Sequence, residues 1–140
     1  MITCTLRYRI DPHKLGEFET YARLWLPLVE RFGGIHHGYF LPHEGANDIA
    51  YALFSFDSLA AYEAYRRDSA DDADCAEAYA HAERTRCILS YERSFTRPLL
   101  PGEGTVAAAV GADAVPVRGD AGLPDGTTAD VIDIDEGRER

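Results

Sequence analysis

The sequence predicts an α+β fold over residues 1–98, with ferredoxin-like β-α-β-β-α-β order. Both ends of this region alternate apolar and polar residues, as strands do. Two stretches between them repeat apolar residues every three or four positions, which is typical of amphipathic helices. The resulting antiparallel sheet would be apolar on both faces, and helices can cover only one of them. We therefore expect a homodimer, in which a second copy covers the other face.

The first strand is predicted over residues 1–10, where Ile2 begins a strict alternation of apolar and polar side chains. Asp11-Pro12 is a helix start, because Asp caps free backbone N–H groups and Pro fits the first helical position. One apolar face then marks a helix of roughly twenty residues that ends at Gly33-Gly34. Pro27 is expected to kink its last third. The apolar face consists of Leu15, Phe18, Ala22, Trp25, Val29 and Phe32.

Three further strands are expected over residues 35–41, 49–56 and 87–95. A loop over residues 42–48 joins the first two of these. In the strand over residues 49–56, large apolar side chains occupy both alternating sets of positions. This doubly apolar strand is the main reason to expect a partner sheet.

The second helical region begins at Asp57-Ser58, which offers an N-cap. The inner face of its first helix is predicted to carry Leu59, Tyr62 and Tyr65. A break is expected over residues 68–73, followed by a further helical stretch over about residues 74–85. This region would cover the same face of the sheet as the first helix.

Residues 99–140 are predicted to form an acidic disordered tail. From residue 101 onward, 3 Lys and Arg against 9 Asp and Glu give −6 of the total charge of −10, and no residue is aromatic. Such a segment cannot bury enough apolar surface to offset the entropy lost on ordering.

The composition also bears on partners and location. The acidic balance and the lack of a basic run argue against nucleic acid. No stretch approaches the ~18 apolar residues of a membrane span. The three cysteines form no C-x-x-C pair, and the N-terminus does not resemble a signal peptide, so we expect a cytoplasmic protein. Nucleotide-binding and zinc-peptidase motifs are missing, and we expect neither a cofactor nor a metal.

With these elements in place, residues 1–98 resemble the NIPSNAP family. The segments that carry the resemblance are Tyr8 with Asp11-Pro12-His13-Lys14-Leu15, Trp25-Leu26-Pro27, Arg31-Phe32-Gly33-Gly34, His36-His37-Gly38-Tyr39-Phe40 and Asp57-Ser58-Leu59-Ala60-Ala61-Tyr62. The resemblance implies a dimeric α+β barrel. Relatives in that superfamily include cofactor-free monooxygenases of quinol-type substrates, heme-degrading monooxygenases and small-molecule isomerases. Bacterial members of the family itself generally lack an assigned reaction.

His36 and His37 are the most informative polar residues. Adjacent strand residues point to opposite faces of a sheet. If His37 shares a side with Tyr39 and faces Trp25, these three side chains line a pocket between sheet and helices. A neutral imidazole there could remove or relay a proton. The alternative is a buried histidine that is satisfied by Tyr or a backbone carbonyl.

The sequence thus leaves two functions open. The first is binding of a small aromatic or apolar molecule, by a protein acting as a cofactor-free oxygenase or isomerase. In that hypothesis His37 is catalytic, and the ligand-binding residues are Trp25, Tyr39, Phe54 and Tyr62. For the aromatic residues, core packing is the competing interpretation. The second function is a non-enzymatic protein-interaction module, in which the acidic tail contacts a basic partner.

Overall fold

The computed structural model describes residues 1–102, and residues 1–98 form one compact unit. The elements are β1 (Ile2–Ile10), a 3-10 turn η1 (Pro12–Lys14), α1 (Leu15–Arg31), β2 (Ile35–Phe40), β3 (Ile49–Phe56), α2 (Leu59–Ala70), α3 (Ala73–Thr85) and β4 (Ile88–Thr96). The predicted α+β order is confirmed, with the second helical region divided into α2 and α3. The tail expected over residues 99–140 lies outside the described residues from position 103 onward.

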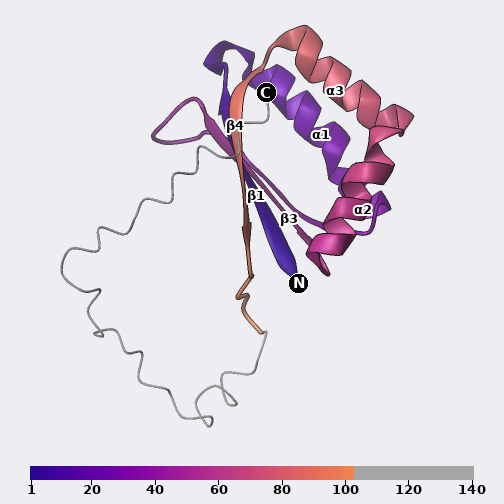
Figure 1. Cartoon of the computed structure of the whole chain (residues 1–140). Helices are drawn as coiled ribbons and strands as arrows, with labels where there is room; N and C mark the ends of the chain where they lie inside the picture. The colour runs from indigo at the N-terminus through magenta and orange to yellow at the C-terminus, as the bar shows by residue number, and fades with distance from the viewer. Residues whose placement is uncertain (103–140) are drawn as a thin grey trace, which may run out of the picture. The chain divides into compact units, whose positions relative to one another are not determined.

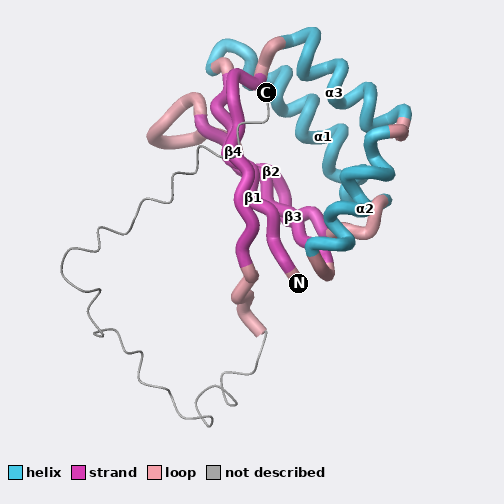
Figure 2. The backbone as a smooth tube through the Cα atoms, in the orientation of Figure 1, coloured by secondary structure: helices cyan, strands magenta, loops and turns pink. Residues whose placement is uncertain are grey.

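The four strands form one antiparallel sheet in the order β2-β3-β1-β4. The three helices lie together on one side of this sheet (Figures 1 and 2). Helix α1 packs against β2 and α3, whereas α2 packs against β3. Within residues 1–102, no helix has both the length and the apolar character that crossing a bilayer requires.

The first helical region begins as predicted but starts with a tighter turn. The Asp11 carboxylate accepts a hydrogen bond from the His13 N–H at 2.9 Å, and η1 precedes α1. Helix α1 continues through Pro27, and the kink expected there stays a prediction. At its end, Gly33 adopts a positive φ of 90°. A Cβ on Gly34 would lie 2.7 Å from Val29 Cγ1, so no larger residue fits there without a shift.

The second helical region is held by two side-chain caps. Ser58 Oγ accepts from the Ala61 N–H at 3.1 Å and begins α2. Asp72 accepts from the N–H groups of Asp74 and Cys75 and begins α3. The break predicted over residues 68–73 is therefore confined to positions 71 and 72.

A bulge in β2 sets the direction of its side chains. His36 pairs with Phe54 and Gly38 pairs with Leu53, so His37 is an extra residue without a partner in β3. Beyond the bulge, Tyr39 lies opposite Ala52. His36 and His37 point to opposite faces as predicted, but the extra residue shifts the alternation beyond them.

The two faces of the sheet differ in their surroundings. The face under the helices carries the core, whose side chains are at most 7% exposed: Cys4, Leu6, Tyr8, Ile10, Phe18, Tyr21, Trp25, Leu28, Val29, Phe54, Phe56 and Tyr65 among them. On the opposite face, which we call the open face, Ile35 is 50%, Phe40 53% and Tyr51 39% exposed. These three residues belong to the neighbouring strands β2 and β3.

Candidate functional site

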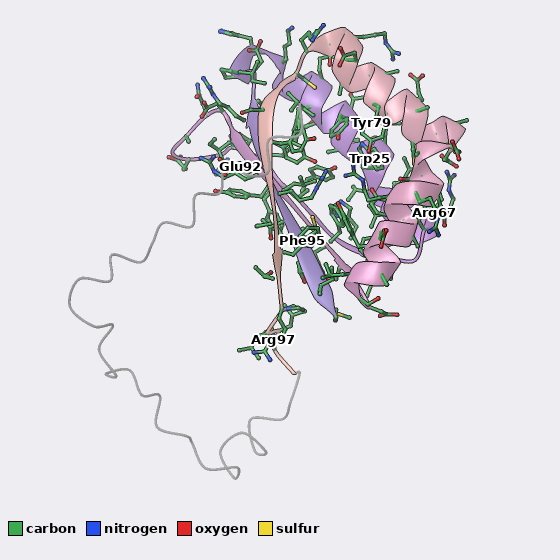
Figure 3. All side chains as sticks on the ribbon, in the orientation of Figure 1. Trp25, Arg67, Tyr79, Glu92, Phe95 and Arg97 are labelled. Atoms are coloured by element: carbon green, nitrogen blue, oxygen red, sulfur yellow. The ribbon has the colours of Figure 1, made fainter. Side chains whose placement is uncertain are left out.

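Aromatic side chains fill the space between sheet and helices. We call this group the aromatic layer; it consists of Tyr8, Phe18, Tyr21, Trp25, His36, Tyr39, Phe54, Tyr65 and Tyr79. The Tyr8 ring lies near its centre, with its centroid 5.2 Å from that of Phe18 and 6.2 Å from that of Tyr39. Trp25 and Tyr79 meet edge to face at 5.0 Å. Figure 3 shows both residues on the helix side of the layer.

The hydroxyl groups of the central tyrosines are uncharged at pH 7. Burial raises the pKa of Tyr8, Tyr21 and Tyr39 well above the ordinary value for a phenol. The Tyr8 hydroxyl also interacts with those of Tyr21 and Tyr39. The layer therefore contains a connected row of neutral phenols.

His36 points into this layer. Its ring stacks on Tyr39 at 5.0 Å and lies 5.6 Å from Phe54. Its Nδ1 accepts a hydrogen bond from the Gly38 N–H at 2.9 Å. Burial, with a smaller effect from His37, lowers the pKa of His36 to about 4. The ring is therefore neutral at pH 7, and because Nδ1 accepts, the proton is assigned to Nε2.

Two N–H donors of the layer lack a hydrogen bond. His36 Nε2 is buried and has no partner within the described part of the chain. Trp25 Nε1 is likewise buried and unpartnered among residues 1–102, in a side chain that is 4% exposed. An unsatisfied buried donor costs about 1–3 kcal/mol. Such groups call for a water or a ligand atom that accepts from them.

His37 lies on the other side of the sheet. Its Nε2 is 2.7 Å from Ser55 Oγ, which is 2.7 Å from Thr3 Oγ1. Ser55 pairs with Ile35 of the open face. The condition for a pocket that includes His37, a shared side with Tyr39, is therefore not met, and the bulge is the cause. A role for His37 in proton transfer stays a prediction.

The other predicted site residues lie on the helix-covered side. Trp25, Tyr39 and Phe54 belong to the aromatic layer, but they lie in different parts of it. Tyr62 lies at its margin, with its ring 4.8 Å from that of Phe95 and its hydroxyl accepting from Arg66 Nη1 at 3.4 Å. Whether they bind a ligand stays a prediction.

Three tyrosines of the layer, Tyr8, Tyr21 and Tyr79, are not among the predicted site residues. Tyr21 follows Phe18 by three positions and precedes Trp25 by four, so helical spacing placed it on the inner face. Tyr8 lies in the first predicted strand, whose alternation indicates a buried side chain but no site. Tyr79 belongs to none of the apolar faces predicted from the sequence. In the structure its side chain is 48% exposed. Within the described residues, no three His, Cys, Asp or Glu side chains are grouped so that they could hold a metal ion.

Comparison with known proteins identifies the fold. The model of the NIPSNAP family matches residues 5–100. An uncharacterised NIPSNAP domain protein from Burkholderia xenovorans is 20% identical with a TM-score of 0.59, over 71% of this chain and 95% of its own. A NIPSNAP family protein from Agrobacterium tumefaciens is 22% identical with a TM-score of 0.56, over 70% and 92%.

A structure with a different description is also similar. It is a putative antibiotic biosynthesis monooxygenase from Nitrosomonas europaea, 8% identical with a TM-score of 0.57, over 71% of this chain and 100% of its own. Identities at this level show the fold alone, which is a ferredoxin-like α+β fold. No curated protein matches the chain significantly.

Proposed function

The chain belongs to the NIPSNAP family, and from this premise we propose that it binds a small aromatic molecule bearing an oxygen atom within the aromatic layer. The observation that carries the proposal is the pair of buried N–H donors, His36 Nε2 and Trp25 Nε1, which lack a partner among residues 1–102. Both donors belong to the same group of aromatic side chains. They are the groups that an oxygen acceptor would satisfy.

The walls of the layer favour an aromatic ligand. Small-molecule sites are mostly apolar and contain a few polar groups that fix the orientation of the ligand. Aromatic pairs contribute about 0.5–1.5 kcal/mol beyond the area that they bury. The contacts between His36 and Tyr39 and between Trp25 and Tyr79 already have stacked and edge-to-face geometry. A planar ring has the shape and the quadrupole to join such a set.

The state of His36 favours an electron-rich oxygen. With Nδ1 engaged by Gly38 and a pKa of about 4, the ring offers a donor and is a poor base at pH 7. Fixed donors in a site shielded from water stabilise a phenolate or an enolate more than they would in water. We therefore assign the stabilisation of the anion to His36, in place of the basic role expected for His37.

This arrangement suits a cofactor-free oxygenase or an isomerase. Both reactions can pass through an enolate or phenolate of the substrate, and the His36 Nε2 donor would stabilise that anion. The structural likeness to a putative antibiotic biosynthesis monooxygenase fits this proposal. We expect oxygen uptake with a naphthoquinol above the uncatalysed rate if the reaction is oxygenation.

Calorimetric titration of the full-length protein with 2-naphthol and naphthalene tests the binding. We expect 2-naphthol to bind more tightly, and His36→Phe to lower its affinity about tenfold through the loss of one hydrogen bond. His37→Phe is the matched control, because its ring lies on the opposite side of the sheet. No binding of 2-naphthol, or a larger loss in His37→Phe, would contradict the proposal.

We further propose that two copies of the chain form a homodimer through the open face. Ile35, Phe40 and Tyr51 expose large apolar side chains on two neighbouring strands. Phe40 lies directly opposite Tyr51, and exposed apolar surface on neighbouring strands favours an interaction site. A second sheet packed face to face would bury all three side chains, as the dimeric α+β barrel fold does.

A further inference from the structure

Five oxidisable aromatic side chains lie in a continuous row through the aromatic layer. In spatial order they are Tyr39, Tyr8, Tyr21, Trp25 and Tyr79, and we call them the Tyr39–Tyr79 row. Their consecutive ring centroids are 6.2, 6.3, 6.2 and 5.0 Å apart. Tyrosine and tryptophan lose one electron more readily than other aromatic side chains, and an electron can hop between rings that are this close. The row therefore offers a route for single electrons through the core.

The row reaches solvent at Tyr79. Tyr8, Tyr21 and Trp25 are at most 7% exposed, whereas Tyr79 is 48% exposed. A phenol is oxidised most easily when it loses its proton at the same time, and burial opposes that loss. Burial raises the pKa of Tyr8 and Tyr21 well above the ordinary value for a phenol, and it raises the pKa of Tyr79 less. Tyr79 is therefore the member of the row on which a radical is most stable.

Trp25 is placed to pass the radical on and not to keep it. Its ring meets that of Tyr79 edge to face at 5.0 Å, and Figure 3 shows both side chains on the helix side. Once oxidised, an indole is a strong acid that becomes a stable neutral radical only after its N–H proton has been taken up. Trp25 Nε1 is buried, and no group among residues 1–102 accepts a hydrogen bond from it. The oxidised indole would thus keep its charge, remain a strong oxidant and draw an electron from the nearest phenol.

We propose that the Tyr39–Tyr79 row carries radicals out of the aromatic layer and that Tyr79 is the surface residue on which they end. The inference goes beyond the proposed function and does not depend on which ligand binds. The oxidant is a peroxyl radical, which oxygen forms with carbon radicals of aromatic substrates. One electron passes from Tyr79 through Trp25 to the peroxyl group, which takes up a proton from water and becomes a hydroperoxide. Tyr79 releases its proton to water and becomes a neutral tyrosyl radical, which ascorbate then reduces by giving up one hydrogen atom.

Laser flash photolysis of the full-length protein without added ligand tests the transfer. Trp25 is the single tryptophan, so light that only indole absorbs produces a radical at this one position. With a cobalt(III) ammine as electron acceptor, we expect the absorbance of the tryptophan radical to decay as that of a tyrosyl radical rises. Because the transfer takes place within one molecule, its rate should not change with protein concentration.

Tyr79→Phe should lose most of the tyrosyl signal and prolong the life of the tryptophan radical, because phenylalanine keeps the ring but is not oxidised. Tyr51→Phe is the matched control, because Tyr51 is 39% exposed but lies on the open face, outside the row. We expect this variant to give the wild-type traces. Ascorbate, which does not enter the core, should shorten the life of the tyrosyl radical in the wild type, so the position of the radical is tested without a substitution.

Three results would overturn the proposal. The first is a tryptophan radical that decays equally fast in the wild type and in Tyr79→Phe. The second is loss of the tyrosyl signal in Tyr21→Phe with the full signal in Tyr79→Phe, because the radical would then move inward to Tyr8 and to its other neighbour Tyr91, 6.3 Å away. The third is a tyrosyl radical that ascorbate does not reach. None of these results bears on the proposed function, because no naphthyl compound is present in the experiment.

Discussion

The two faces of the sheet achieve burial by different means. Under the helices, Tyr8, Phe54 and Phe56 are at most 4% exposed and pack against rings from the same chain. On the open face, Phe40 and Tyr51 remain 53% and 39% exposed. The same alternation along the strands produces both faces. One face is completed within the chain, whereas the other keeps apolar surface that a partner can cover.

The neighbouring residues His36 and His37 show this difference at the smallest scale. His36 enters the aromatic layer and stacks on Tyr39, whereas His37 contacts Ser55 on the open face. One extra residue in β2 decides which imidazole faces the candidate site. Chemistry at this site therefore depends on strand register as much as on residue type.

The largest expected effect concerns stability on the covered face. Phe56→Ala should lower the free energy of unfolding by about 3–5 kcal/mol, because it leaves a cavity beside Tyr65. Urea denaturation at a fixed protein concentration measures the loss. Phe40→Ala on the open face should cost less, and its cost should vary with protein concentration. Equal, concentration-independent losses would remove the proposed distinction between the faces.

The open face should control association. Analytical ultracentrifugation is expected to show a wild-type dimer, and Tyr51→Glu should raise its dissociation constant roughly 100-fold or more, since it buries an unpaired charge. Leu26→Glu is the matched control, because Leu26 is an exposed apolar residue of α1. If both variants associate as the wild type does, the open face is not the dimer interface.

Substitution by Ala should have opposite effects on stability at Gly34, which precedes β2, and at Gly16 in α1. Gly34→Ala should destabilise the protein by about 1–3 kcal/mol, because its Cβ would lie within 2.9 Å of Val29 and Phe56 side-chain atoms. Gly16→Ala, inside α1 with nothing within 4 Å of its Cβ, should stabilise by about 0.5–1 kcal/mol. Thermal unfolding measures both changes. A neutral Gly34→Ala variant would show that the covered face packs more loosely than described.

A further expected effect is a pH dependence that belongs to His36. Its pKa is lowered from 6.5 to about 4 in the folded protein, so the unfolded chain binds more protons between these values. Stability should therefore fall as pH falls from 6.5 toward 4. In His36→Phe this part of the decrease should disappear. An NMR titration that finds a His36 pKa near 6.5 would contradict the burial of its ring.

The helices and strands can be predicted from the sequence because nearby residues determine where each of them begins and ends. The alternation of residues 2–10, the Asp11 and Ser58 caps and the glycines after α1 all act over a few positions, and all are confirmed. The site depends on longer-range effects. The bulge at His37 arises from pairing with β3, which residue periodicity does not reveal.

The single tryptophan offers the most direct test of the account. Its indole N–H, which lacks a partner among residues 1–102, gives one unambiguous signal in a ¹H–¹⁵N NMR spectrum. We expect this signal to shift when 2-naphthol is added, because a ligand within the aromatic layer changes the surroundings of Trp25 Nε1. If calorimetry shows that the ligand binds while the Trp25 signal stays in place, the ligand lies outside the aromatic layer and the central claim is wrong.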